Sequence, residues 1–485
     1  MRRILAGVET EYGLLVEGHG AEDQVEDATT LVRGYPGECL ALWDYRHESP
    51  RADLRGFQLK RLAVDPVDGA FDVGRSHGRP EDVRSDRVLT NGARFYNDHG
   101  HPEYSTPECW SADEVAWQDR LGESVVLDAA RQMAASIGRS VRLYKNNTDF
   151  HGASYGTHES YLVPREVGFE RLFEGILPML VVRQVLTGSG KVGSESGVWC
   201  DFQISQRADF FMEPVNAETL YRRPIFNTRD EAHANPESWI RLHVISGDAN
   251  MMPSCTARKV GLVQLALHLI DAQACPSWQF KDAVEAVKSI SRDASNTFRV
   301  ELTGRSWTTA YEILESYFAA AESCLDLDPT WTLLIEKCRW LSNELSTIGP
   351  EGEFRRHVDW AAKKTMIASF LEEEGGTWKD GPARAFDLEY HNIDPDEGLF
   401  HALAGMNEVE PFVKASREEP TRAFARGLAI RKFGDHIVSV CWRSITFKIE
   451  DRIVEVELKP DILYPRDLEK APDVVTFIRI LREER

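Results

Sequence analysis

The chain has 485 residues, of which 42% are hydrophobic and 28% are charged. This composition is that of a folded globular protein and excludes the disordered and fibrous classes. The formal net charge of −21 disfavours nucleic acid as the main partner, because phosphate binding needs a basic surface. No apolar stretch approaches the ~20 residues of a membrane span, and Glu9 comes too early for the apolar core of a signal peptide. The eight scattered cysteines form no C-x-x-C pair, so we expect reduced thiols and a cytoplasmic protein with no membrane segment.

The N-terminal part is expected to begin with a strand over residues 3–15, and its alternation places Glu9 and Glu11 on the same face. Residues from about 46 to 87 are rich in Arg, Asp, Gly and Pro, and we interpret them as a long mobile loop. The pattern then predicts, in order, a strand or strand-turn that opens at 87–89 and runs through Phe95 and Tyr96, a helix over 113–137 that ends near Gly138, and a strand over 141–144.

The middle of the chain, from about 256 to 373, has helical apolar spacing with Pro and Gly breaks near 276, 304 and 349. Residues 168–187 carry both helical and strand signals, and the pattern does not decide between them. Period-two alternation over 436–458 predicts a small β-meander, and residues 465–485 have helical spacing. We therefore expect a large domain over 1–417 and a small C-terminal domain over 418–485.

Two acidic segments form the first candidate site. Glu9 and Glu11 lie on the first predicted strand, and Asp98 and Glu103 lie in the segment 91–104. Carboxylate oxygens are the hard ligands that Mg²⁺ prefers, and carboxylates are almost never buried unless they are paired. A solvated edge strand explains the same composition equally well, so the residues alone leave both interpretations open.

A histidine and a glycine-rich segment are less informative. His158 stands beside a carboxylate and could be a metal ligand or a general base, although a structural histidine is the more common case. The pattern H-E-x-x-H is not completed there, because position 162 is Leu. The segment TGSGKVG at 187–193 is not a P-loop, because G-x-x-x-x-G-K-[ST] needs Gly at 185 and Ser or Thr at 192, and both positions are Val.

Arginines beside amide side chains form a third candidate site. Arg207 follows Gln206, Arg229 follows Asn227 and Thr228, and Arg241 precedes His243 by two positions. Guanidinium groups suit the two-point binding of phosphate or carboxylate. Local salt bridges without a catalytic role are the common alternative for such charged runs.

Several of these stretches occur together in the order typical of one family. They are GVETEYG (7–13), LTNGARFYNDHGHPEYSTPE (89–108), LYKNNTDFHGASYGTHESYL (143–162), RQVLTGSGKVG (183–193), ISQR (204–207), FNTRDEAHA (226–234) and RLHVISGDAN (241–250), with weaker matches at DLEYHNI (387–393), TRAFARG (421–427) and CWRSITF (441–447). The sequence resembles the Pup ligase / Pup deamidase family along nearly its whole length. This resemblance implies an α+β fold like that of glutamine synthetase, with a curved antiparallel sheet flanked by helices. The catalytic domain would span 1–417 with an inserted loop at about 46–87, and the small domain 418–485.

Two activities occur in that family. The ligase joins the C-terminal glutamate of Pup, a small disordered ubiquitin-like protein, to substrate lysines with ATP consumption. The deamidase, or depupylase, converts the C-terminal glutamine of Pup to glutamate and cleaves the isopeptide bond. TNGAR (90–94), GASYG (152–156), TGSGKVG (187–193) and the segment 43–57 followed by a long loop resemble the deamidase branch, whereas Thr106 and Cys109 resemble the ligase. We expect the hydrolase, with the ligase as the runner-up and a non-catalytic Pup-binding module as the third hypothesis.

The resemblance also implies roles for single residues. Asp98 resembles the catalytic aspartate, which either deprotonates a water or attacks the carbonyl itself. The implied magnesium ligands are Glu9, Tyr96 and Glu103, with Glu11 and His158 in or beside the same shell and His243 lining the adjoining pocket as a further candidate ligand. The implied nucleotide contacts are Arg94, Thr106 and Trp442, and Arg207 and Arg229 resemble a phosphate clamp. ATP, or ADP with phosphate, and Mg²⁺ are the expected cofactors. Pup or a Pup-like modifier, pupylated proteins and a bacterial proteasome are the expected partners.

Overall fold

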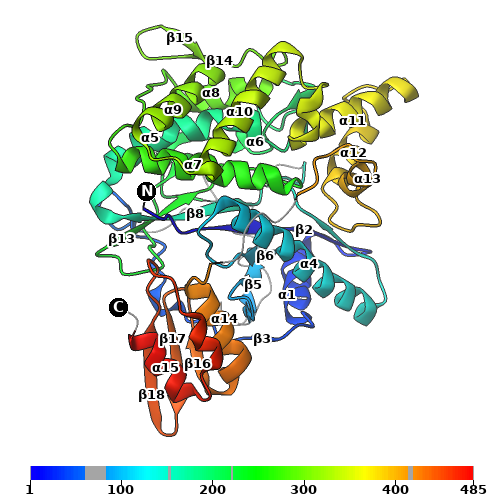
Figure 1. The fold of residues 1–485 in the computed structure, drawn as a ribbon. Helices are drawn as coiled ribbons and strands as arrows, with labels where there is room; N and C mark the ends of the chain where they lie inside the picture. The colour runs from blue at the N-terminus through cyan, green and yellow to red at the C-terminus, as the bar shows by residue number, and fades with distance from the viewer. Residues whose placement is uncertain (1, 61–83, 151–153, 220–221, 413–418, 484–485) are drawn as a thin grey trace.

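The computed structural model describes residues 2–60, 84–150, 154–219, 222–412 and 419–483 (Figure 1). Its centre is a seven-stranded sheet in the order β13-β8-β1-β6-β5-β4-β3. Every neighbouring pair in this sheet is antiparallel, as predicted. The strands are β1 (Ala6–Glu11), β3 (Cys39–Leu40), β4 (Arg87–Leu89), β5 (Arg94–Asp98), β6 (His101–Ser105), β8 (Thr157–Pro164) and β13 (Trp239–Val244).

The single strand predicted over 3–15 is divided into two. β1 lies in the large sheet between β6 and β8, whereas β2 (Gly13–Val16) leaves it and pairs with β7 (Val141–Tyr144) in a separate two-stranded sheet. The alternation that the sequence shows is nevertheless real. Glu9 and Glu11 share one face of β1, while the residues that alternate with them, Ala6, Val8 and Thr10, are buried on the other face against the helices.

Helices cover the sheet on the side opposite to these glutamates. The predicted helix over 113–137 is α4 (Ala112–Ile137), which begins where the Ser111 side chain accepts a hydrogen bond from the Glu114 amide and ends at the left-handed Gly138. The undecided segment 168–187 is helical, forming α5 (Phe169–Val182) and α6 (Gln184–Thr187). In Figure 1, α5 and α7 (Pro253–Asp271) lie above the sheet with α9 and α10. No helix in the described ranges is long and apolar enough to cross a membrane.

The middle of the chain is helical, as predicted, with one exception. Its helices are α8 (Ala283–Arg292), α9 (Ala310–Cys324), α10 (Pro329–Thr347) and α11 (Asp359–Glu374), followed by α12 (Gly381–Tyr390) and α13 (Leu399–Gly405). The break expected near 304 is a hairpin of β14 (Arg299–Glu301) and β15 (Trp307–Thr309). Strands of three residues are too short to show a period-two pattern, which explains why the sequence did not indicate them.

The described residues 46–60 of the segment 46–87, which was interpreted as a long mobile loop, consist mainly of turns and isolated bridges and are anchored by buried contacts. Asp53 is 2% exposed and accepts hydrogen bonds from the Arg55 guanidinium at 2.8 Å and from the Thr228 hydroxyl at 2.6 Å. The charged residues of this segment therefore include pairs that allow it to pack, because each buried carboxylate needs a partner. Residues 61–83 of the predicted loop lie outside the described residues.

The C-terminal residues form a lobe of their own, drawn in orange and red in Figure 1. It contains α14 (Arg422–Phe433), the predicted meander of β16 (Ile437–Val440), β17 (Ser444–Ile449) and β18 (Arg452–Glu457), and α15 (Val474–Glu483). Its apolar side chains, among them Phe447 and Phe477, form a separate hydrophobic cluster. Residues 413–418 lie outside the described ranges, so the division at 417/418 stays a prediction.

Helix α14 packs directly on the turn that precedes β5. A Cβ atom on Gly427 would lie 2.3 Å from the Thr90 carbonyl oxygen and 2.9 Å from the Gly92 nitrogen. Both are backbone atoms, so the helix would have to move away from the turn.

Gly427→Ala is therefore expected to destabilise the protein by about 1–3 kcal/mol, because overpacking forces the backbone apart. Gly405→Ala is the control, since a Cβ there meets nothing within 4 Å and Gly405 is also a helical residue, the last of α13. Thermal unfolding of both variants is the measurement. Equal melting temperatures for the two variants would show that α14 does not pack as described.

Candidate active site

One acidic cluster lies on the three central strands of the sheet. The carboxylates of Glu11, Asp98 and Glu103 offer oxygen atoms that all lie within 4.8 Å of one another. Glu11 is directly opposite Glu103 in the β1–β6 register, and Asp98 is the last residue of the neighbouring β5. Residues opposite each other on antiparallel strands share one face, which explains how three distant segments meet here.

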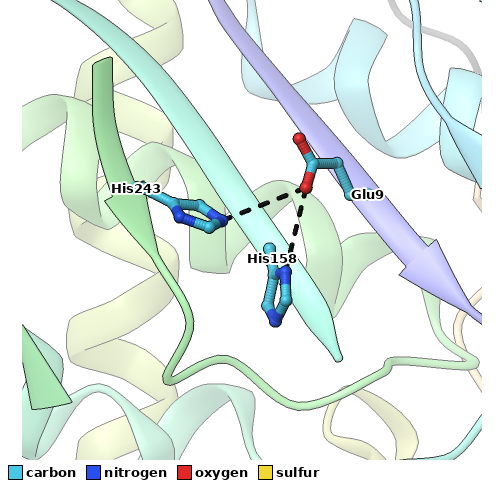
Figure 2. Close-up of side chains that lie close together, drawn as sticks. All are labelled: Glu9, His158 and His243. Carbon is cyan, nitrogen blue, oxygen red and sulfur yellow. Dashed lines mark ion pairs between the residues drawn. The ribbon is translucent and has the colours of Figure 1, made fainter. Parts of the chain in front are cut away.

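A second cluster continues the same row across the sheet. Glu9 lies opposite His158 on β8, and His243 comes from β13, the next strand (Figure 2). The Glu9 Oε2 atom is 3.8 Å from His158 Nδ1 and 3.9 Å from His243 Nε2. Six predicted site residues therefore form one line over β13, β8, β1, β6 and β5.

Asp98 is placed by a tight hairpin. His99 and Gly100 form the two-residue turn between β5 and β6, with φ of 47° and 90°. Two positive φ values in a two-residue loop match the twist of antiparallel strands, and glycine adopts them without strain. The Asp98 side chain remains 24% exposed at the end of this hairpin, so a substrate can reach its carboxylate.

The pKa values of Asp98 and Glu103 are shifted in opposite directions. Burial raises the pKa of Asp98, but the charges of His99, Arg84 and Arg94 outweigh it and hold the pKa below its usual range. Burial, followed by the charges of Asp98 and Glu9, raises the pKa of Glu103 well above its usual range. Asp98 is therefore ionised at neutral pH and available as a base or nucleophile, while Glu103 is poised to bind a proton or a cation.

The residues present fit a divalent cation. Both ring nitrogens of His243 are buried without a hydrogen-bond partner, and burial, followed by Arg241, lowers the pKa of this ring well below its usual range. A neutral imidazole among carboxylates is a suitable ligand set for a metal ion. Glu9, Glu11, Glu103, His158 and His243 could hold such an ion. The Tyr96 hydroxyl donates a hydrogen bond to Glu103, and its own role as a ligand stays a prediction.

Thr106 and Trp442 line one cavity, as expected for two contacts of the same ligand. The cavity encloses about 470 Å³ of space, part of it open to solvent, and Glu9 lies in its wall. Arg94 does not line it. The Arg94 guanidinium is paired with Asp86 at 2.6 Å and lies 4.1 Å from the centre of the Trp43 ring, which in turn contacts Trp442. Arg94 therefore contacts Trp442 only through Trp43 and does not itself line the cavity.

Arg207 is buried and Arg229 is partly buried, and neither has a carboxylate partner among the described residues. Within the described ranges neither guanidinium makes an ion pair, and the Nε atom of each has no hydrogen-bond partner. Burial, followed by the charge of Arg223, lowers the pKa of Arg207 to about 10, and burial lowers that of Arg229. Local salt bridges therefore do not explain these two residues, and both have unused capacity for an anion.

Arg241 belongs to the third candidate site of the sequence analysis, and the family resemblance gave it no role of its own. Its guanidinium donates a hydrogen bond to Glu9 Oε1 at 3.2 Å and lies 3.5 Å from Glu231. Arg241 and His243 are two positions apart on β13 and so share a face, a signal that the alternation of RLH already contained. This arginine is the protein's own counter-charge to Glu9.

The chain is similar to known proteins along most of its length. Residues 3–446 match the profile of the family described as Pup-ligase protein. The chain belongs to this family. It is 35% identical to the depupylase of Acidothermus cellulolyticus and 37% identical to the Pup deamidase/depupylase of Mycolicibacterium smegmatis, in each case over 93% of this chain and 92% of the relative. It is 38% identical to the Pup–protein ligase of Saccharomonospora viridis, over 88% of this chain and 89% of the relative.

Two solved structures share the architecture. The complex of Pup with its ligase PafA matches with a TM-score of 0.77 and 25% identity, over 99% of this chain and 91% of that one. PafA in complex with ADP matches with a TM-score of 0.72 and 28% identity, over 88% of this chain and 96% of that one. The α+β fold expected from the resemblance is confirmed.

Glu103→Gln is expected to raise the melting temperature of the metal-free protein and to reduce the further rise that Mg²⁺ causes. Removing the charge relieves repulsion with Asp98 and Glu9, so the variant should melt at a higher temperature than wild type in EDTA. Mg²⁺ should raise the melting temperature of wild type by several degrees but that of the variant very little, because a ligand is lost. Calorimetry under both conditions measures this. A similar Mg²⁺ shift in both proteins would argue against a cation at this cluster.

Proposed function

We propose that this chain is a nucleotide- and Mg²⁺-dependent hydrolase that acts on Pup or a Pup-like modifier. It converts a C-terminal glutamine of the modifier to glutamate and cleaves the isopeptide bond to substrate lysines. The observation that carries the proposal is the accessible Asp98 carboxylate beside a cluster of carboxylates and histidines whose chemistry fits a cation. The relatives named depupylase or Pup deamidase/depupylase support it, because they match over 93% of the chain, whereas those named Pup–protein ligase match over 80–88%.

The binding steps follow from the charges of the site. Glu9, Glu11, Glu103, His158 and His243 hold Mg²⁺, and Arg207 and Arg229 bind the phosphate end of ATP, or of ADP with phosphate. Thr106 and Trp442 contact the rest of the nucleotide, with Arg94 behind them. When bound, the ion would supply positive charge beside the carbonyl under attack, and the nucleotide would help to order the site around it. The arginines reduce the cost of bringing further negative charge into the site.

Asp98 performs the chemical step by one of two routes. As a base, it takes a proton from water, the water oxygen attacks the amide carbonyl, and the carbon–nitrogen bond breaks as the leaving amine gains the proton. As a nucleophile, its Oδ atom attacks the carbonyl directly, and the carbon–nitrogen bond breaks as the leaving amine takes a proton from water. The hydroxide that remains hydrolyses the resulting anhydride and regenerates the Asp98 carboxylate. Both routes need an ionised carboxylate at the hairpin end, which the charges of His99, Arg84 and Arg94 favour.

The proposal extends to organisation and setting. We assign catalysis to residues 1–417 and place 418–485 as a small domain that completes the nucleotide pocket through Trp442. The partners are Pup or a Pup-like modifier and pupylated proteins, in a cytoplasm that also contains a bacterial proteasome. The nucleotide acts as a cofactor and is not consumed in each turnover.

Asp98→Asn is expected to reduce release of substrate from a Pup conjugate by about 10²- to 10⁴-fold, because an amide neither accepts the proton nor attacks. Binding of Pup should stay close to that of wild type, since the substitution keeps the size of the side chain. Electrophoresis of a Pup–substrate conjugate with Mg²⁺ and ATP, together with an ADP assay and Pup titration, gives all three readouts.

The same experiment separates the alternatives. Free substrate with little ADP supports hydrolysis. Net growth of conjugate with matching ADP release would establish the ligase instead. A wild-type protein that binds Pup but turns over no conjugate would favour a binding module.

A further inference from the structure

His391 lies directly after helix α12, in the segment DLEYHNI (387–393), to which the proposed function gives no role. Its side chain is fully buried, so each ring nitrogen needs a partner inside the protein. The Nδ1 atom is 2.7 Å from the Lys145 carbonyl oxygen, and the Lys145 amide donates to the His391 carbonyl at 2.8 Å. The Nε2 atom is 2.8 Å from the Gln206 side-chain nitrogen. His391 therefore bridges two segments from different parts of the chain.

The hydrogen bonds of Gln206 determine which nitrogen of His391 carries the proton. The Gln206 Oε1 atom accepts from the Asn147 amide at 2.7 Å, so the Gln206 Nε2 atom is the donor towards His391. The His391 Nε2 atom must then accept, and the proton lies on Nδ1, which donates to Lys145. The Lys363 ammonium, 2.8 Å away, donates to the same Nε2 atom. Burial, followed by the charge of Lys363, lowers the pKa of His391 well below its usual range, which keeps the ring neutral.

Lys363 is itself fixed by the glycine-rich segment TGSGKVG (187–193) and by α12. Its ammonium donates to the Gly190 carbonyl at 2.6 Å and pairs with the buried Asp387. The second oxygen of Asp387 accepts a hydrogen bond from the Val192 amide at 2.6 Å. A buried ion pair whose remaining contacts are satisfied keeps one geometry, because movement would leave a charge uncompensated. Through Lys363, the His391 ring is therefore tied to the glycine-rich segment as well.

Gln206 is the residue directly before Arg207, and it is fixed through both its backbone and its side chain. Its amide donates a hydrogen bond to Asp248 Oδ2 at 3.1 Å, and its side chain is held by His391. Both Gln206 and Arg207 are buried, and the Arg207 Nε atom has no hydrogen-bond partner. A long arginine side chain keeps one position only when the residues that support it are locked in place. The contact with His391 therefore bears on where the Arg207 guanidinium lies.

We propose that His391 is a positioning residue for the phosphate clamp and acts through Gln206 on Arg207. This inference rests on the proposed function, since it takes Arg207 to bind the phosphate end of the nucleotide. His391 itself contacts neither the nucleotide nor the reacting atoms. Its effect should therefore be confined to ligands that extend to Arg207, and it should vanish when Arg207 is removed.

The test compares two substitutions that each keep one half of the imidazole. His391→Asn keeps a donor near the position of Nδ1 but loses the acceptor at Nε2, and with it the contact with Gln206. His391→Gln extends to the position of Nε2, where its Oε1 atom can accept from Gln206, but loses the donor at Nδ1. Titration calorimetry with Mg²⁺ measures the affinity of each variant for AMP-PNP, a non-hydrolysable ATP analogue, and for ADP.

His391→Asn is expected to weaken AMP-PNP binding by about 10- to 100-fold, the range for loss of a partner that orients a ligand-binding side chain. Its affinity for ADP should stay close to that of wild type, because ADP lacks the terminal phosphate. His391→Gln should bind both nucleotides nearly as tightly as wild type. In an Arg207→Ala background, His391→Asn should cause no further loss, since both substitutions remove the same contact with phosphate.

His268→Asn is the matched control. His268 is also a buried histidine, and burial lowers its pKa to about 4, so its ring is neutral too. It packs against Trp331 beside a different cavity, and its variant should bind both nucleotides like wild type. If His391→Asn does not fold, Gln206→Met removes the same contact from the other side and carries the same expectations.

Four results would overturn the inference. Unchanged AMP-PNP affinity in His391→Asn would remove the positioning role. Equal losses in His391→Asn and His391→Gln would show general damage to the core and no specific role for the contact with Gln206. A loss that persists in the Arg207→Ala background would show that His391 does not act through Arg207. The fourth result concerns the proposed function itself: Arg207→Ala would bind AMP-PNP as tightly as wild type, which would refute the phosphate clamp and with it the inference.

Discussion

Mutual repulsion of carboxylates is the constraint on which the site depends. Glu11, Asp98 and Glu103 lie within 4.8 Å of one another, and Glu9 follows on the same strand face. Like charges this close, and largely removed from water, cannot all remain ionised without positive charge nearby. The shifts divide the group. The pKa of Asp98 lies below its usual range and that of Glu103 well above it. The Asp98 carboxylate is therefore ionised, whereas Glu103 is the carboxylate that a proton or a cation would neutralise. Divergent environments of this kind commonly separate the roles of paired carboxylates.

The antiparallel sheet makes this crowding unavoidable. Its register sets Glu11 opposite Glu103 and Glu9 opposite His158, so the distances follow from strand pairing and not from flexible loops. A rigid scaffold prevents the carboxylates from moving apart, and relief has to come from Arg241, the histidines or a bound ion. Arg207 and Arg229 extend the same logic to an anion, because neither guanidinium has a carboxylate partner in the described part of the chain and the Nε atom of each has no hydrogen-bond partner.

The sequence predicted the face of a strand correctly but not the neighbours of that strand. Period-two alternation was enough to place Glu9 and Glu11 together, because that periodicity is local. The contacts of Glu9 with His158 and His243 join residues far apart in the chain, and no local pattern encodes such a register; only the family resemblance suggested them. The same limit applies to the anchoring of residues 46–60. Asp53 is buried because Thr228, 175 positions away, reaches it, and composition contains no trace of that bond.

Glu108 links the large sheet to the C-terminal lobe beside the cavity that residues of both parts line. It lies two residues beyond Thr106 and forms ion pairs with both Arg422 and Arg426 of α14. Burial raises the pKa of Glu108, but the charges of the two arginines outweigh it and hold the pKa below its usual range. Without this carboxylate, two buried guanidinium groups would face each other uncompensated, which costs far more than a surface ion pair contributes. The same arginines bond to the carbonyls of His233 and Trp442. Docking of the C-terminal lobe therefore places Trp442 beside His233, and the cavity that both residues line is complete only where the lobe is in place.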